Sequence, residues 1–335
     1  MDLEICYLLV VPFEPPPALG PTETVPAPKD APYFYDLDIE FCSAGQREIV
    51  VEGVPVRVHL QVLDGLVWVA ECRYLLADAL GETALARKQA IQTTLKTRLQ
   101  REAGYSGSVI EEYTLLLIQR ARPTPDEFVN AHAPTLARLL RSLPKPLNQA
   151  DASDIVGSRA RYSESDLTIV DWVGAIVIAE EGDFQSDIEL LKIGNYQLLR
   201  YRLLDQTIEQ SLQRLRRNVE SARLTWLPSR NRTVQAVVEQ RLALLLDFEK
   251  IDQSLLLIGD WYSARVYRLI VDQFYLDEWK ATVSSKLDRL STIDEIVRQN
   301  LTFSWRRALD LAQFVGWLIL LVGYFVLFIV DVGGR

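Results

Sequence analysis

The stretch VPVRVHLQVLDGLVWVAECRY, residues 54–74, decides the fold of the N-terminal half of the chain. Apolar and polar residues alternate from Val54 to Leu63, which is the pattern of a β-strand with one buried and one exposed face. Asp64-Gly65 then supplies two residues that adopt positive φ easily, the signal of a two-residue type I′ turn, and a second strand runs to Tyr74. The sequence therefore predicts a β-hairpin.

The register of this hairpin assigns a face to His59. A two-residue turn places Val62 opposite Val67 and His59 opposite Ala70. We therefore expect His59 to be a solvent-side strand residue rather than a catalytic or metal-binding one.

Outward from the hairpin, further strands and helices predict an α+β domain with a mixed sheet over residues 1–182. Apolar or β-rich runs predict strands at 5–11, 33–41, 48–51, 113–118, 167–170 and 174–179. The proline-rich stretch between the first two predicts a long surface loop. Helices are predicted at 82–101 and 124–143, the second with Thr124 as N-cap and Pro125 at its first position.

From Gln185 the pattern becomes helical and predicts a bundle or stalk over residues 183–310. Large residues follow a three-and-four spacing, with Gly194 and Asp205 at the two positions that lack an apolar side chain. We interpret this spacing as an oligomer seam formed by Leu191, Leu198, Tyr201, Asp205, Ile208, Leu212 and Leu215. The same spacing is consistent with packing inside one chain, where Asp205 would be a hydrated position.

The last apolar stretch, Leu311–Val330, predicts a transmembrane helix. It contains no charged residue and no histidine, and roughly 20 helical residues cover a hydrocarbon core of about 30 Å. Only the short tail 331–335 follows, so we expect a single-pass, tail-anchored protein. Arginines before the span place the bulk of the chain on the cytoplasmic side or its equivalent in an organelle.

Residues at and within this predicted span suggest how it is held. Trp305, Arg306 and Arg307 are expected to form a collar at the membrane surface. Gly316 and Gly323 are seven positions apart and share one helix face, where they would permit close contact with another helix. The expected partners are the lipid bilayer and either further copies of the chain or a membrane-complex partner.

Composition and motifs argue against several function classes. The net charge of −9 argues against general nucleic-acid binding. The three cysteines lack zinc-site spacing, the two histidines are far apart, and GxxxxGK[ST], GxGxxG and HExxH are absent from the sequence. We therefore expect no metal, no cofactor and no catalytic residue set.

Several motifs lie in the C-terminal half: DLTIVDW at 166–172 followed by Gly174-Ala175, NYQLLRYRLLD at 195–205 and GDWYSARVY at 259–267. With them, residues 167–330 resemble the membrane-anchored family named "required for meiotic nuclear division". The resemblance implies a membrane-tethered α/β and helical protein, and eukaryotic members support organelle translation from the inner membrane. It implies no enzymatic residues.

The leading hypothesis is a tail-anchored structural or tethering protein that oligomerises through its helical region and presents an α/β domain at the membrane surface. One alternative is a subunit of an oligomeric channel or transporter resembling the CorA type, although that type has two spans and a Gly-Met-Asn signature. A second alternative is a membrane-tethered enzyme with an unrecognised site.

Overall fold

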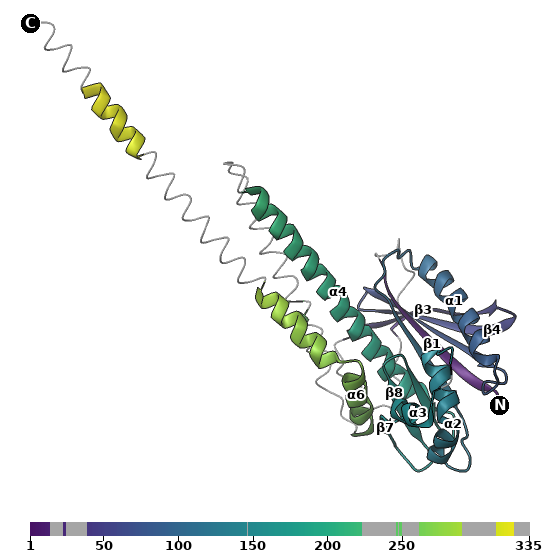
Figure 1. Cartoon of the computed structure of the whole chain (residues 1–335). Helices are drawn as coiled ribbons and strands as arrows, with labels where there is room; N and C mark the ends of the chain where they lie inside the picture. Colours follow the sequence, from purple (N-terminus) through teal and green to yellow (C-terminus); the bar gives the residue numbers. More distant parts are fainter. Residues whose placement is uncertain are drawn as a thin grey trace, which may run out of the picture. The chain divides into compact units, whose positions relative to one another are not determined.

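The computed structural model describes residues 1–13, 23–24, 39–145, 147–222, 246, 248–249, 261–289 and 313–324 (Figure 1). The chain divides into two compact units. The first unit comprises Met1–Gln206 with Leu246–Val283, and the second comprises Thr207–Leu245 with Ser284–Arg335. The sheet and most of the described helices belong to the first unit.

Within the described residues, the sheet has nine strands in the order β2-β3-β4-β5-β1-β6-β9-β8-β7. The strands are β1 (Leu3–Pro12), β2 (Glu23–Thr24), β3 (Phe41–Val51), β4 (Val54–Leu63), β5 (Val67–Leu76), β6 (Glu111–Ile118), β7 (Arg159–Ala160), β8 (Leu167–Asp171) and β9 (Gly174–Ile178). Neighbours pair antiparallel except β6 and β9, which are parallel. The predicted mixed α/β sheet is therefore present.

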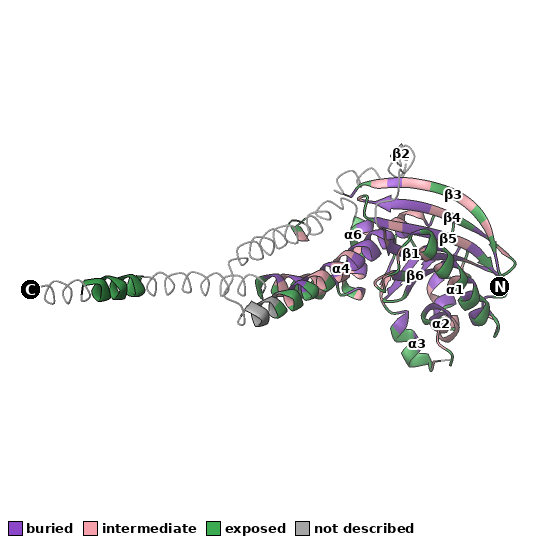
Figure 2. Cartoon of the chain, turned by 90° about the horizontal axis from the view of Figure 1, so that it is seen from above, coloured by how far each residue is buried: buried purple, intermediate pink, exposed green. Residues whose placement is uncertain are grey.

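β1 lies in the middle of the sheet, between β5 and β6 (Figure 2). Its apolar run from Ile5 to Val11 is at most 2% exposed. A strand covered on both faces reads as a continuous apolar run in the sequence, which explains why β1 takes a central position.

The described helices that carry labels are α1 (Ala84–Glu102), α2 (Pro125–Arg141), α3 (Gln149–Ile155), α4 (Gln185–Ala222) and α6 (Trp261–Gln273). Residues 276–289 and 313–324 are also helical. The predicted cap of α2 is confirmed, because the Thr124 side chain accepts a hydrogen bond from the Glu127 N–H at 3.3 Å and Pro125 occupies the first turn.

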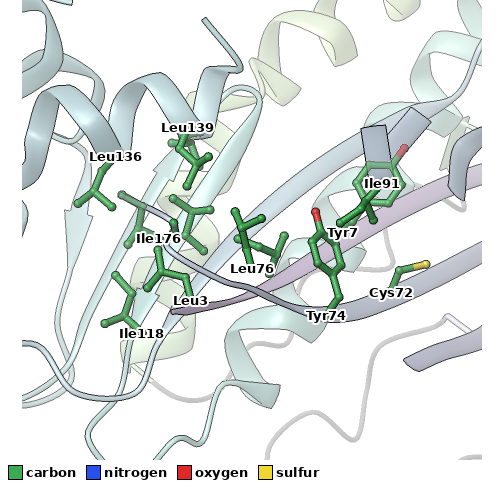
Figure 3. Packing of buried hydrophobic residues seen from close by; sticks show 14 of the residues in the cluster. Leu3, Tyr7, Cys72, Tyr74, Leu76, Ile91, Ile118, Leu136, Leu139 and Ile176 are labelled. Carbon is green, nitrogen blue, oxygen red and sulfur yellow. The ribbon is translucent and has the colours of Figure 1, made fainter. Parts of the chain in front are cut away.

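Helices cover both faces of the sheet. On one face, Ile91 of α1 and Leu136 and Leu139 of α2 join the main apolar cluster with strand residues such as Ile176 (Figure 3). On the other face, a separate cluster joins α4 to the strands β1, β4 and β5; its buried members are Val10, Ile39, Leu63, Val67, Val69, Ile193, Tyr196 and Leu199. α4 is therefore fixed to the sheet by its N-terminal half.

The predicted hairpin forms, but its register is one residue away from the prediction. Leu63 pairs with Val67, so the turn contains three residues, Asp64, Gly65 and Leu66. Asp64 and Gly65 both have positive φ, as expected. Because a one-residue shift moves every residue of one strand past its predicted partner, His59 lies opposite Glu71 rather than opposite Ala70.

The prediction of a membrane-spanning helix at Leu311–Val330 is wrong, because none of the helices in the described ranges is both long and apolar enough to cross a bilayer. The helix described there covers residues 313–324. Residues 311–312 and 325–330 lie outside the described residues.

The predicted fold class, the tail-anchored and single-pass assignments and the predicted membrane localisation all depended on this span. They are corrected with it. The described fold is a mixed α/β sheet unit with several helices.

Candidate ligand-binding pocket

A pocket of about 300 Å³ opens between strands β3, β4 and β5 and the first residue of α4. Its lining residues share one property, since all are polar or charged: Gln46, Arg57, His59, Glu71, Arg73 and Gln185. A lining of this composition suits a small polar or charged ligand, whereas drug-sized ligand sites are mostly apolar.

The strand register brings the lining residues together. Across the three strands, Gln46 pairs with His59, and His59 pairs with Glu71. Two residues further along, Arg57 lies opposite Arg73. Because side chains alternate between the faces of a strand, these residues share the α4 face, while Val56, Val58 and Leu60 fill the core on the other face.

Lys192 of α4 contacts Glu71 of the pocket lining, and its side chain is 0% exposed. Its Nζ lies 2.5 Å from Glu71 Oε2 and donates hydrogen bonds of 2.8 Å to Gln61 Oε1 and to Glu189 Oε1. Gln61 and Glu189 accept hydrogen bonds from the ammonium, and Glu71 is paired with it as an oppositely charged group. The buried charge is therefore fully partnered, which a buried lysine requires.

A closed ring of side chains results. Arg73 Nε donates to Glu71 Oε1 at 2.5 Å, and Arg73 Nη2 donates to Gln185 Oε1 at 2.6 Å. Gln185 Nε2 donates to Glu189 Oε1 at 2.6 Å, which leads back to Lys192. Such a ring fixes the orientation of the Arg73 guanidinium at the pocket wall.

The ring determines the charge of each group. Burial alone would raise the pKa of Glu71, but Lys192 and Arg73 lower it to about 2. Burial, followed by the charge of Lys192, lowers the pKa of His59. At neutral pH the pocket therefore presents Arg57, Arg73 and a neutral His59 imidazole. The negative charge of Glu71 is balanced by its ion pairs with Lys192 and Arg73.

A second polar cluster lies on the other side of α4. Asp187 Oδ1 accepts hydrogen bonds of 3.0 Å from Thr168 of β8 and from Tyr262 of α6. Burial raises the pKa of Asp187 to about 6, although both hydrogen bonds lower it. Thr168 and Tyr262 belong to two of the motifs that carry the family resemblance, so at these positions the motifs pack helices against the sheet.

The predicted oligomer seam lies largely inside the single chain. Leu191, Leu198, Tyr201 and Ile208 are buried, Asp205 and Leu212 are half-buried, and the Leu215 side chain lies outside the described residues. Gly194, on the same helix, approaches α6 so closely that an added Cβ would lie 2.3 Å from Ile270 Cγ2. This burial favours the intramolecular interpretation of the pattern, and oligomerisation stays a prediction.

The other predicted contact residues are exposed or not described. A Cβ on Gly316 or Gly323 would meet nothing within 4 Å. Trp305, Arg306 and Arg307 lie outside the described residues. In the described ranges, no group of three or more His, Cys, Asp or Glu side chains is arranged to hold a metal ion.

The sequence interpretation missed the pocket. Arg57, Glu71, Arg73 and Lys192 were not recognised as functional candidates. A signal for the pocket is present in the sequence, because both hairpin strands carry a row of polar residues on one face. The wrong register, however, placed His59 opposite Ala70 instead of Glu71, so the two polar rows were not recognised as one cluster. Lys192 and Gln61 are 131 positions apart, and nothing in the sequence pattern links them.

Comparison with known proteins gives two matches. A family model described as "Uncharacterized protein MJ0711, N-terminal domain" matches residues 49–185, a range that contains every lining residue except Gln46. The uncharacterized protein MJ0711 of Methanocaldococcus jannaschii is 26% identical over 193 residues, which cover 58% of this chain and 59% of that protein. The match thus spans less than two thirds of that relative. No solved structure matches this chain. The resemblance to the meiotic nuclear division family stays a prediction.

Proposed function

We propose that this protein is a binding protein whose sheet unit holds a small anionic ligand in the pocket lined by Arg57, Arg73 and His59. The observation that carries the proposal is a pocket lined by polar and charged residues, with two guanidinium groups among them. Guanidinium groups bind carboxylate and phosphate oxygens through paired N–H donors, and they keep their charge at all physiological pH values.

The donor inventory of the two arginines supports this proposal. The hydrogen bonds described for Arg73 use two of its five N–H groups. Arg57 has a 66% exposed side chain and pairs with Glu4 at 3.4 Å. Both arginines can therefore donate further hydrogen bonds to a ligand.

Binding is favoured over catalysis by the chemistry of the lining residues. They include no hydroxyl or thiol nucleophile. Their carboxylate, Glu71, is a weak base because its two cationic partners lower its pKa to about 2.

The test is a thermal-shift and calorimetric titration of the full chain with small anions at constant ionic strength. We expect saturable binding and a higher melting temperature, both lost in Arg57→Gln. Arg268→Gln is the matched control, because Arg268 is a 79% exposed arginine on α6 that does not line the pocket. Equal responses of the two variants, or no saturable binding to the unmodified chain, would refute the proposal.

A second candidate function is association of the chain with other copies of itself through its helical unit. The supporting observation is the helix at residues 313–324, whose large apolar side chains are exposed; Trp317 is 69% and Leu320 is 71% exposed. Contiguous apolar surface of this kind marks interaction sites. Light scattering of the purified full chain should give a multimer whose mass falls when Trp317 and Leu320 are changed to Ser, and a monomer would refute the idea.

A further inference from the structure

Arg57 and Arg73 form a like-charged pair on neighbouring strands. They are direct cross-strand partners in the β4–β5 register, where Cβ atoms lie about 4.5–5.5 Å apart. Like charges in this position destabilise a sheet unless an anion lies between or beside them. Burial alone would lower the pKa of Arg73, but Glu71 and Glu4 raise it, so the pair stays charged and two guanidinium groups line the pocket side by side.

The protein's own carboxylates are shared among three cations. Glu71 contacts Arg73, but it also carries the contact with Lys192, and Glu189 contacts Lys192 as well. Arg57 has Glu4, at 3.4 Å and with both side chains partly in solvent. An exposed pair of this kind contributes little, because water and salt screen it. Arg57 can therefore exchange this screened contact with Glu4 for a contact with a ligand anion.

We propose that the ligand of this pocket is a phosphoryl group, carried by inorganic phosphate or by a small phosphate monoester, which binds between Arg57 and Arg73. This inference rests on the anion-binding function proposed above and names the ligand class. A phosphoryl group carries a charge of about −1.5 to −2 at pH 7 and three strong acceptor oxygens. Two guanidinium forks match this charge and this number of acceptors better than they match one carboxylate.

The neighbouring groups fit the same ligand. Neutral His59 can donate one N–H, and the amides of Gln46 and Gln185 add donors at the rim. None of the lining residues has an aliphatic side chain, and the imidazole of His59 is the aromatic ring among them. Polar and charged lining residues suit a ligand whose remaining part is also small and polar.

The experiment is isothermal titration calorimetry of the full chain at pH 7.5 and fixed ionic strength, with phosphate, glycerol 3-phosphate, acetate and succinate. We expect at least one of the two phosphoryl ligands to bind tenfold or more tightly than either carboxylate. Tighter binding of glycerol 3-phosphate identifies a phosphate monoester as the ligand, and tighter binding of phosphate identifies the free ion.

Variants tie the affinity to the opposed arginines. Arg57→Gln should weaken phosphoryl binding at least tenfold, and Arg57→Lys should weaken it less because lysine keeps the charge but loses the two-pronged donor geometry of the guanidinium. Arg268→Gln should match the unmodified chain, and circular dichroism verifies that each variant is folded. Carboxylates that bind as tightly as phosphoryl ligands would overturn this inference and leave the anion-binding function intact, whereas the absence of any anion binding would overturn both.

Discussion

Two buried lysines offer a direct test of whether charge pairing or burial alone decides stability in this fold. Lys192 is 0% exposed and has two carboxylates and an amide as partners. Lys88 of α1 is 1% exposed, and among the described residues its ammonium has one hydrogen bond, 2.8 Å long, to Ser142 Oγ. We predict that the same substitution, Lys→Met, acts in opposite directions at the two positions.

Lys192→Met should destabilise the protein by about 3–5 kcal/mol, because it leaves the buried carboxylates of Glu71 and Glu189 without their shared cation. Lys88→Met should stabilise it at pH 7. Burial lowers the pKa of Lys88 from 10.5 to about 8, so keeping its charge costs roughly 3 kcal/mol at pH 7. Loss of the hydrogen bond to Ser142 offsets about 1–2 kcal/mol of that gain.

The pH dependence has a defined sign for Lys88. Its pKa in the folded state is below its unfolded value, so the unfolded chain binds more protons between pH 8 and pH 10.5. The destabilisation is therefore fully present below pH 8 and is lost as the pH rises to 10.5. Lys88→Met should be most stabilising near pH 7 and close to neutral or slightly destabilising at pH 10.5.

The assay is urea unfolding followed by circular dichroism. For an m-value of roughly 3 kcal/mol per molar, Lys192→Met should lower the midpoint by about 1 M or more, and Lys88→Met should raise it slightly. A double-mutant cycle of Lys192→Met with Glu71→Gln should give a coupling energy of at least about 1 kcal/mol. Shifts of equal size and sign in the two Lys→Met variants would refute the reasoning, because burial alone would then explain both.

Further predictions concern three other positions. Burial raises the pKa of Asp187 from 3.8 to about 6, so the charge of this carboxylate costs stability increasingly as the pH rises from 3.8 to 6. Asp187→Asn should therefore raise the melting temperature at pH 7.5 and not at pH 4. An equal difference in melting temperature between the variant and the unmodified chain at both pH values would contradict this prediction. The lowered pKa of Glu71 acts in the opposite sense, so its contribution to the free energy of unfolding is present above pH 4.5 and is lost as the pH falls to about 2. Glu71→Gln should therefore make the free energy of unfolding depend less on pH in that range. Gly194→Ala should cost about 1–3 kcal/mol in urea unfolding because of the contact with Ile270, whereas a gain would indicate that α4 and α6 separate without cost.

The hairpin illustrates what the sequence could and could not predict. Alternation of apolar and polar residues identified β4, β5 and the faces of β4, because this signal depends only on local side-chain period. The register depends on turn length, and the third turn residue, Leu66, is apolar and gives no turn signal. Leu66 therefore determines whether His59 lies opposite Ala70 or Glu71, and with it whether the polar residues of the pocket can be predicted to lie together.

The helical half shows a different limit. The three-and-four spacing on α4 identified its buried side. The same spacing is found whether that side packs against elements of the same chain or against a helix of another copy. Tertiary contacts of Leu191 and Ile208 with the rest of the chain were not encoded in any local pattern. In the same way, charge-free length suggested a membrane span at 311–330, whereas none of the helices in the described ranges is long and apolar enough to cross a membrane.

The central position of β1 has a consequence for synthesis on the ribosome. β1 is made before both of its neighbours, β5 and β6, and β6 ends only at Ile118. At roughly 5–20 residues per second, the nascent strand waits about 5–20 s before both of its edges can be paired. During that interval an apolar segment with unpaired backbone groups is open to other chains. The yield of folded protein should therefore depend on elongation rate and on chaperone access over the first hundred or so residues, well before α4 is made.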